Sequence, residues 1–207
     1  MAGALRYLLK NMTDDFFIGI LNGGSSRRMG SPKSLAVYNG TTFAEIIYKE
    51  ASEITQNIVF LGASPLPDSL KDKTVIPDDG SGGGPFQAAR SAYVYRKTDW
   101  FLWAVDMPLI TKDIVLDIIS QKGRYNGNSI PYNKDLGVFE PFCAYYSKNL
   151  LRQLSLLYSD KFYSIQKMFR FLEIKGNSEI FEKYKNEIRD FNYCPPDRKQ
   201  YEFNKKR

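Results

Sequence analysis

Apolar runs alternate along the first half of the chain with stretches in which apolar residues recur at helical intervals. Four runs have the length or composition of buried strands: residues 16–21, 57–62, 74–76 and 100–105. Helical spacing is found between them, at residues 42–53, capped by Thr41 or Thr42, and at residues 87–94. Apolar runs without polar alternation are typical of parallel strands covered on both faces. The pattern therefore predicts an α/β fold with a mostly parallel central sheet.

The second half of the chain has a less regular pattern. The predicted elements are helices at 111–122, 148–158, 164–172 and 178–189, and strands at 129–132 and 142–146. Residues 1–15 precede the first strand and are expected to form an N-terminal extension outside the core. The chain has 207 residues, which fits one domain, and we expect that domain to span residues 16–207.

The composition excludes several kinds of chemistry. The sequence has no histidine, so Ser-His-Asp hydrolysis is excluded and the commonest transition-metal ligand is missing. Its two cysteines, Cys143 and Cys194, form no C-x-x-C pair, and we expect them to be free thiols without zinc or a disulfide. A bound metal would have oxygen ligands, which favours Mg²⁺.

Charge and hydropathy limit the partners. The net charge is +6, and residues 161–207 carry 12 Lys and Arg against 7 Asp and Glu. Because these charges alternate in sign at helical spacing, a solvated helix face is favoured over nucleic-acid binding. No apolar run is long enough to cross a membrane, and no signal peptide is evident, so a cytoplasmic protein without membrane contact is expected.

Residues 16–33 join a buried strand to a loop with phosphate-binding chemistry. Adjacent Gly23 and Gly24 allow backbone N–H groups to approach an anion, and Arg27, Arg28 and Lys33 follow. Neither the P-loop pattern G-x-x-x-x-G-K-[ST] nor the dinucleotide pattern G-x-G-x-x-G is present. The alternative is a glycine turn followed by a solvated basic helix start. The order of strand, glycines and cations favours a nucleoside triphosphate loop.

The loop resembles the signature L-x-G-G-x-S-x-R-M-G-x-x-K of the molybdenum cofactor guanylyltransferases, and the similarity extends over about residues 18–110. The resemblance implies a three-layer, Rossmann-like nucleotidyltransferase fold. It also implies that residues 16–110 bind the nucleotide and residues 111–207 bind the acceptor. The residues expected at the nucleotide are Leu21, Asn22, Gly23, Gly24 and Lys33. Arg27 and Lys33 are expected to take part in catalysis by binding phosphate oxygens.

A second glycine-rich loop covers residues 77–85, with Asp78 near its start. It is either a flexible connection or a loop that passes close to a base or ribose. The second interpretation is favoured because the loop lies one strand from the first. The segment resembles the family's P-D-x-x-x-x-G-P-L-A-G, although Phe86-Gln87-Ala88 stands in place of L-A-G. Asp78 is therefore expected to bind nucleotide.

Asp106 follows the most apolar run in the chain. An ionised carboxylate at the end of a buried strand is costly unless it is paired or binds a metal. A helix-capping role is the alternative, but Thr111 is the better cap. Asp106-Met107-Pro108 resembles the family's D-M-P, in which the aspartate holds Mg²⁺ on the triphosphate. Asp106 is thus expected to be a catalytic, nucleotide-binding and metal-binding residue.

The resemblance implies transfer of GMP from GTP to molybdenum-molybdopterin, giving molybdopterin guanine dinucleotide and pyrophosphate. Molybdoenzymes or their chaperones would then be partners. Near the C-terminus Cys194 and Pro195 replace residues of the family's N-x-N-T-P-x-D, while Asn192 matches its first asparagine. Glu140 lies where the family often has substrate contacts. The alternatives are a cytidylyltransferase acting on molybdopterin or on a sugar or polyol phosphate, and a nucleotide-binding protein without turnover.

Overall fold

The computed structural model describes residues 16–23, 32–77, 86–159 and 164–189. Its central sheet has the strand order β5-β4-β1-β6-β9. The strands are β1 (Phe16–Leu21), β4 (Ile58–Leu61), β5 (Val75–Ile76), β6 (Asp99–Ala104) and β9 (Cys143–Tyr146). All neighbours pair in parallel except β9, which runs antiparallel to β6. The predicted α/β fold with a mostly parallel sheet is confirmed.

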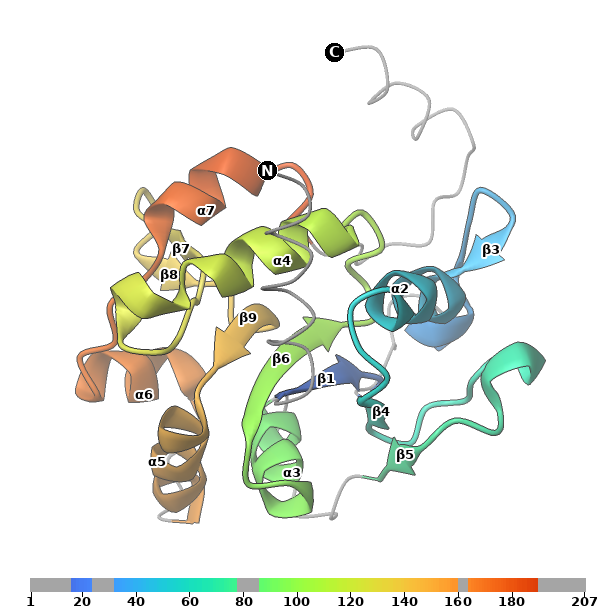
Figure 1. The fold of residues 1–207 in the computed structure, drawn as a ribbon, viewed down its shortest axis with the longest axis horizontal. Coiled ribbons are helices and arrows are strands. Elements are labelled where there is room, and N and C mark those ends of the chain that lie inside the picture. Colours follow the sequence, from blue (N-terminus) through green and yellow to red (C-terminus); the bar gives the residue numbers. More distant parts are fainter. Residues whose placement is uncertain (1–15, 24–31, 78–85, 160–163, 190–207) are drawn as a thin grey trace, which may run out of the picture.

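Helices cover both faces of this sheet, so the molecule has three layers (Figure 1). One face packs against α2 (Phe43–Ser52), α4 (Lys112–Ser120) and α7 (Ser178–Tyr184). The other face packs against α3 (Gln87–Tyr95), α5 (Lys148–Ser159) and α6 (Ile165–Phe171).

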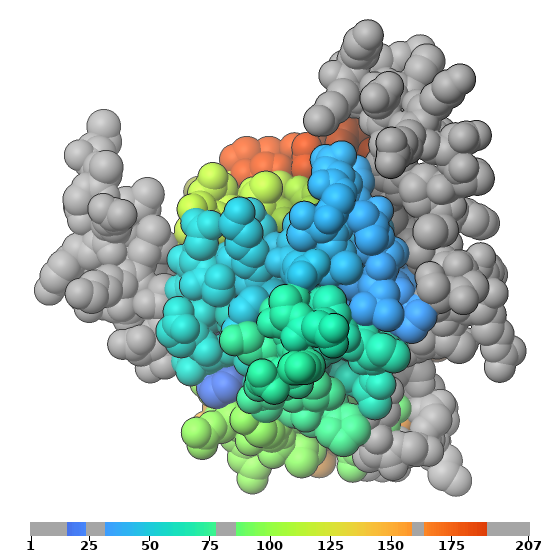
Figure 2. Space-filling model, turned by 90° about the vertical axis from the view of Figure 1, so that its right-hand side faces the viewer, coloured from blue at the N-terminus to red at the C-terminus, as the bar shows by residue number. Residues whose placement is uncertain are grey.

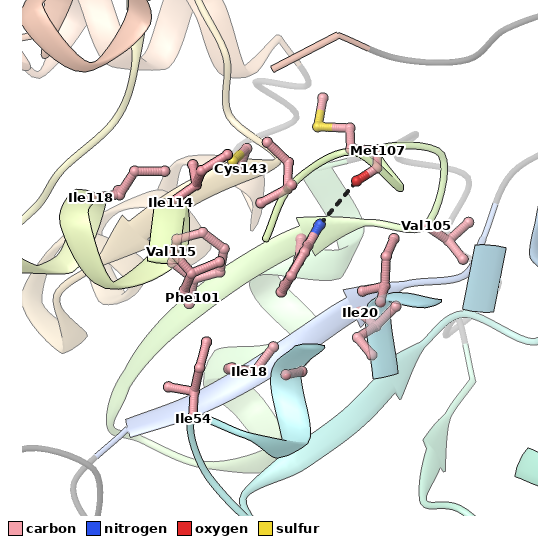
Figure 3. Close-up of a cluster of buried hydrophobic side chains, with 14 of the residues drawn as sticks. Ile18, Ile20, Ile54, Phe101, Val105, Met107, Ile114, Val115, Ile118 and Cys143 are labelled. Atoms are coloured by element: carbon pink, nitrogen blue, oxygen red, sulfur yellow. Dashed lines mark hydrogen bonds between the residues drawn. The ribbon is translucent and has the colours of Figure 1, made fainter. Parts of the chain in front are cut away.

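Side chains of β6 alternate between these two layers, as strand geometry requires. Phe101 and Trp103 lie in the cluster with α2 and α4, whereas Trp100 and Leu102 lie in the cluster with α3 and α5. All four are fully buried. Figure 3 shows the first cluster, where Phe101 lies beside Val115 of α4. Since both faces of the strand are covered, its continuous apolar sequence is explained.

The remaining described strands and 3₁₀ helices are short. Two small hairpins pair β2 (Val37–Tyr38) with β3 (Thr41–Thr42), and β7 (Tyr132–Asn133) with β8 (Val138–Phe139). The described residues also include the 3₁₀ helices η1 (Lys33–Leu35), η2 (Asp68–Leu70) and η4 (Lys122–Tyr125). Figure 2 shows the side of the molecule on which much of the surface belongs to residues 32–77, from η1 to β5.

Helix α2 begins as the sequence predicts. Thr42 is its N-cap and accepts a hydrogen bond from the Glu45 N–H, while the Glu45 carboxylate accepts one from the Thr42 N–H. This capping box stabilises the first turn. Thr111 is the N-cap residue of α4, as predicted, although its side chain makes no capping hydrogen bond.

Two predictions for the second half are wrong. Residues 129–132 form no continuous strand, because Ser129 makes an isolated bridge to Tyr145 and the chain then enters the β7–β8 hairpin. The last helix ends at Tyr184 instead of Arg189. The N–H groups of Glu187 and Ile188 both donate to the Tyr184 carbonyl, and the resulting turn buries Ile188 in the core.

An interaction between α4 and α7 holds the last helix in place. The Asp117 carboxylate accepts hydrogen bonds from Lys183 Nζ and Tyr184 Oη, both at 2.7 Å. Burial alone would raise the pKa of Asp117, but these two hydrogen bonds lower it. The same contact raises the pKa of Lys183 to about 12.

Among the helices of the described residues, none has the length and apolar character that a bilayer crossing requires.

Candidate active site

The carboxyl ends of β1, β4 and β6 meet at one edge of the sheet, and their hydrogen bonding continues past the last strand residues. The Val105 N–H donates to the Leu21 carbonyl at 3.1 Å, and the Asn22 N–H donates to the Leu61 carbonyl at 2.7 Å. The chain leaving β1 is therefore fixed between the ends of its two neighbours. This is the edge at which open parallel sheets bind ligands.

Lys33 approaches this edge on the short helix η1. The buried Ser34 hydroxyl donates to the Pro65 carbonyl at 2.6 Å, which ties η1 to the loop after β4. The turn is closed by hydrogen bonds from the Leu35 N–H to the Pro32 carbonyl and from the Ala36 N–H to the Lys33 carbonyl. Lys33 thus extends from a constrained turn.

Asp106 lies in a tight turn directly after β6. The Met107 N–H donates to the Ala104 carbonyl at 3.1 Å, and Trp103 Nε1 donates to the Met107 carbonyl at 3.4 Å. Figure 3 draws this second hydrogen bond and shows Val105 and Met107 among the core side chains. Both flanking side chains are buried, so the backbone at Asp106 has little freedom.

Lys33 and Asp106 form an ion pair through Nζ and Oδ2, although 73 positions separate them in the chain. The Asp106 side chain is 10% exposed and that of Lys33 is 26% exposed. A nearly buried carboxylate is thus paired, as its burial requires. Both charged ends remain partly accessible at the cavity described below.

The ends of β1 and β4 approach each other more closely than side chains would permit. Gly62 has φ +106°, and a Cβ at this position would lie 2.6 Å from both N and Cα of Gly23. Asn22 and Ser64 add two contacts, with the Ser64 N–H donating to the Asn22 carbonyl and Asn22 Nδ2 donating to the Ser64 carbonyl. Gly62 therefore sets the position at which the glycine loop leaves β1.

A cavity of about 530 Å³ opens at this edge. Its lining includes Leu21, Gly23, Lys33, Ala104, Val105, Asp106 and Met107. The other lining residues are Glu140, Phe142, Phe181, Lys185, Ile188 and Arg189. The first group comes from the half of the chain before residue 111 and the second from the half after it. The cavity thus combines charged groups with an aromatic and aliphatic surface.

The residues at the cavity could hold Mg²⁺ only together with oxygen atoms of a bound substrate. Among the described residues, no three His, Cys, Asp or Glu side chains are grouped closely enough to hold a metal by themselves. Mg²⁺ is commonly held by one or two carboxylates together with substrate phosphates and water. Asp106, an oxygen donor on the cavity wall, fits that arrangement once a triphosphate is present.

Cys143 is not among the residues that line the cavity and belongs to the hydrophobic core. It is a free, fully buried cysteine, as predicted, and burial raises the pKa of its thiol, with the neighbouring Glu140 adding to the effect. A thiol with a raised pKa is a poor nucleophile. Cys194 lies outside the described residues.

The structure brings together several of the predicted site residues. Leu21, Gly23, Lys33 and Asp106 line the cavity, and Asn22 lies between two of these. Predictions that fall outside the described residues concern Gly24, Arg27, Arg28, Asp78, Asn192, Cys194 and Pro195. Glu140 lines the cavity as well.

Some contributors were missed from sequence. Gly62 follows a strand directly, which is a usable signal for a tight approach, whereas Ser34 gives none. Lys185 was assigned to a solvated helix face, because lysines and acids alternate over residues 179–185, and Arg189 was expected only as the last residue of that helix.

Comparisons by sequence place the chain among proteins of one kind. The family model of the MobA-like NTP transferase domain matches residues 18–177. A probable molybdenum cofactor guanylyltransferase of Natranaerobius thermophilus is 29% identical over 174 residues, which are 80% of this chain and 84% of that protein. One from Bacillus cereus is 27% identical over 149 residues, 69% of this chain and 74% of the relative.

Solved structures show the same fold. The molybdopterin-guanine dinucleotide biosynthesis protein A of Archaeoglobus fulgidus aligns with a TM-score of 0.68 at 19% identity, over 92% of this chain and 99% of that one. The 2-C-methyl-D-erythritol 4-phosphate cytidylyltransferase of Thermus thermophilus aligns with a TM-score of 0.55 at 12% identity, over 79% and 88%.

The fold, the site and these relatives together define the class of protein, which is a nucleotidyltransferase. Within that class, the chain belongs to the family of MobA-like NTP transferase domains.

Proposed function

We propose that the protein transfers GMP from GTP to molybdenum-molybdopterin, forming molybdopterin guanine dinucleotide and releasing pyrophosphate. The observation that carries the proposal is the Lys33–Asp106 pair, which lies beside Gly23 at the cavity between the two halves of the chain. The names of the relatives in Natranaerobius and Bacillus support the choice of substrates.

The residues expected at the nucleotide would act mainly through charge and position. Lys33 places an ammonium group where phosphate oxygens gather negative charge, and the predicted contributions of Gly24 and Arg27 are of the same kind. Asp106 would hold Mg²⁺, which supplies further positive charge to the triphosphate when bound. Such a site needs little covalent participation from the protein.

The reaction itself is an in-line displacement at the α-phosphorus of GTP. An oxygen of the acceptor phosphate forms a bond to this phosphorus, while the bond to the pyrophosphate oxygen breaks. The acceptor phosphate is already ionised at neutral pH, so the protein need not remove a proton. The absence of histidine from the sequence is consistent with this reaction.

The cavity residues that come after residue 111 support a binding role for the second half of the chain. Phe142, Phe181 and Ile188 offer an apolar surface for the body of an acceptor. Lys185 and Arg189, which also line the cavity, carry the charge that suits an acceptor phosphate. Three statements remain predictions. The first is that residues 16–110 bind the nucleotide and residues 111–207 bind the acceptor. The others are that molybdoenzymes or their chaperones are partners and that the protein is cytoplasmic.

The test is a comparison of the four nucleoside triphosphates. Purified protein is mixed with Mg²⁺, molybdenum-loaded molybdopterin and each triphosphate in turn, and pyrophosphate release is followed. We expect release with GTP. Release with CTP alone would reject the guanylyl assignment in favour of a cytidylyltransferase. Omission of Mg²⁺ should abolish the signal.

Two aspartates on β6 and its following turn provide a matched pair of variants. Asp106→Asn should lower transfer by several orders of magnitude because the expected metal ligand is weakened. Asp99 lies at the opposite end of the strand, where its carboxylate accepts hydrogen bonds from Tyr145 Oη and the Lys148 N–H. Asp99→Asn should reduce stability by about 1–3 kcal/mol while transfer by the folded protein stays close to normal.

A further inference from the structure

A second cavity, of about 560 Å³, lies in the half of the chain after residue 111. It is lined by η4, α6, α7, the connection between these two helices and the β7–β8 hairpin. Helices α6 and α7 and the hairpin lie side by side at the left of Figure 1. No described residue lines both this cavity and the candidate active site. Its volume is within the range of small-molecule sites.

Contacts between the lining segments hold this second cavity in shape. Arg170 Nη2 donates to the Gly137 carbonyl at 3.1 Å, which joins α6 to the hairpin. The Tyr132 N–H donates to the Asn177 carbonyl at 3.1 Å, which joins the hairpin to the start of α7. Gly176 passes so close to the hairpin that a Cβ there would lie 2.4 Å from the Tyr132 Cβ. The second cavity is therefore already formed without a ligand.

Tyr125 brings a hydroxyl without a protein partner to this cavity. The residue is only 9% exposed and lines the cavity, yet none of the hydrogen bonds that join the described residues involves its hydroxyl. Burial raises the pKa of Tyr125, and the charge of Glu179 adds to the effect, so the hydroxyl keeps its proton. Buried polar groups are almost always paired in folded proteins. This donor therefore calls for an acceptor from outside the chain.

The charged residues of the second cavity favour an anion. They are Lys134, Arg170, Glu173, Lys175 and Glu179. Glu179 already pairs with Arg124 at 3.5 Å, which leaves three cations facing one acid. Lys175 Nζ lies 5.3 Å from the centre of the Tyr125 ring, so a cation and the free hydroxyl donor belong to neighbouring side chains. Ammonium and hydroxyl donors together suit a phosphate group.

Aromatic side chains form another part of the lining. The ring centres of Tyr132 and Phe139 are 4.7 Å apart, and those of Phe139 and Phe169 are 5.0 Å apart. Phe139 and Phe169 are buried, whereas Tyr132 is half-buried and keeps an accessible part of its ring. A flat ring in the cavity can extend this aromatic group at Tyr132.

We propose that the second cavity binds a small organic phosphate that carries a flat aromatic ring. The phosphate accepts hydrogen bonds from the Tyr125 hydroxyl and from Lys175, and the ring packs against Tyr132. A neutral aromatic compound would leave the cations unused, and inorganic phosphate would leave the aromatic lining in water. The proposal requires neither GTP nor the acceptor, so it does not depend on the proposed function.

The experiment titrates the ¹⁵N-labelled full chain with phenyl phosphate, which combines the two chemical parts, and follows the amide signals by NMR. We expect a Kd of about 1 mM or lower, as suits a ligand of this size. The largest shifts should fall on the second cavity, for example at Gly176 and Ser178. Inorganic phosphate and benzyl alcohol each carry one part only, and each should bind about fivefold more weakly or worse.

Four variants separate the site from general effects. Tyr125→Phe should raise the Kd about 2- to 10-fold with an unchanged Tm, because its hydroxyl has no partner in the protein. Lys175→Gln should raise it about tenfold. Tyr184→Phe makes the same change where the hydroxyl donates to Asp117 at 2.7 Å, so it should lower the Tm and keep the Kd. Lys167→Gln removes a charge of α6 that lies outside the lining and should also keep the Kd.

Several results would overturn the inference. One is the absence of shifts at the second cavity up to about 10 mM phenyl phosphate, and another is shifts confined to the candidate active site. A Kd unchanged in both Tyr125→Phe and Lys175→Gln would reject the assigned phosphate contacts. Equal binding of inorganic phosphate would reject the aromatic part. Because no transfer is measured, failure here leaves the proposed function standing, and failure of GMP transfer leaves this binding result standing.

Discussion

Replacing Gly62 by alanine should displace the start of the chain after β1, where the sequence predicts a nucleotide-binding loop. The added Cβ would lie 2.6 Å from N and Cα of Gly23 and 2.8 Å from the carbonyl carbon of Asn22. These are backbone atoms, which cannot rotate away as a flexible side chain would. The ends of β1 and β4 must therefore separate, and the loop that follows β1 must shift with them.

The magnitude has two parts. The φ of +106° at Gly62 is strained for alanine, which costs about 1–3 kcal/mol. Forcing an extra methyl group against fixed atoms costs about 1–3 kcal/mol more. The sum, about 2–6 kcal/mol, is a large fraction of the roughly 5–15 kcal/mol that stabilises a typical domain.

Gly40→Ala is the control for the strain alone. Gly40 lies in the turn of the β2–β3 hairpin with φ +81°, and an added Cβ there would meet nothing within 4 Å. It should lose only about 1–2 kcal/mol. Urea unfolding of both variants gives the difference, and the KM for GTP should rise in Gly62→Ala but not in Gly40→Ala. Equal stability losses with unchanged KM values would refute the close-approach argument.

Three further predictions follow from other contacts. Lys33→Ala should lower kcat/KM for GTP by about 10²-fold, whereas Lys112→Ala, which removes an exposed surface pair, should leave it unchanged. Lys185→Gln and Arg189→Gln should each raise the KM for a phosphorylated acceptor severalfold without changing that for GTP, measured by steady-state kinetics. Asp117→Asn should lower the Tm near neutral pH, and the gap to wild type should narrow as the pH falls below 3.8, measured by thermal unfolding.

The sign of the pH effect follows from the lowered pKa of Asp117. The unfolded chain takes up the proton at a higher pH than the folded protein does, so ionised Asp117 stabilises the fold above its ordinary pKa. This stabilisation is lost as the pH falls through the lowered pKa of the folded state. The control for the loss of an exposed ion pair is Glu182→Gln, which removes the partner of Lys185. A Tm gap for Asp117→Asn that is constant with pH would contradict the assignment.

Much of the fold could be predicted because the apolar pattern of each segment matched the burial of that segment in the structure. The apolar runs before Asn22 and Asp106 are continuous, and only a strand covered on both faces accommodates such a sequence. The prediction failed at residues 129–132 and at the end of α7. There the outcome was decided by the pairing of Ser129 with Tyr145 and by the burial of Ile188, both of which depend on distant residues.

The sequence by itself determined the type of sheet, the glycine loop and the two residues, Lys33 and Asp106, that bear the expected chemistry. Only the tertiary structure decided that these two side chains meet, that Gly62 presses on Gly23, and that Lys185 and Arg189 share the cavity. The physical reason is the distance along the sequence between the residues that produce each feature. Strand and loop signals arise from neighbouring residues, whereas the cavity is made by the strand order, which brings together segments as far apart as β1 and the chain after α7.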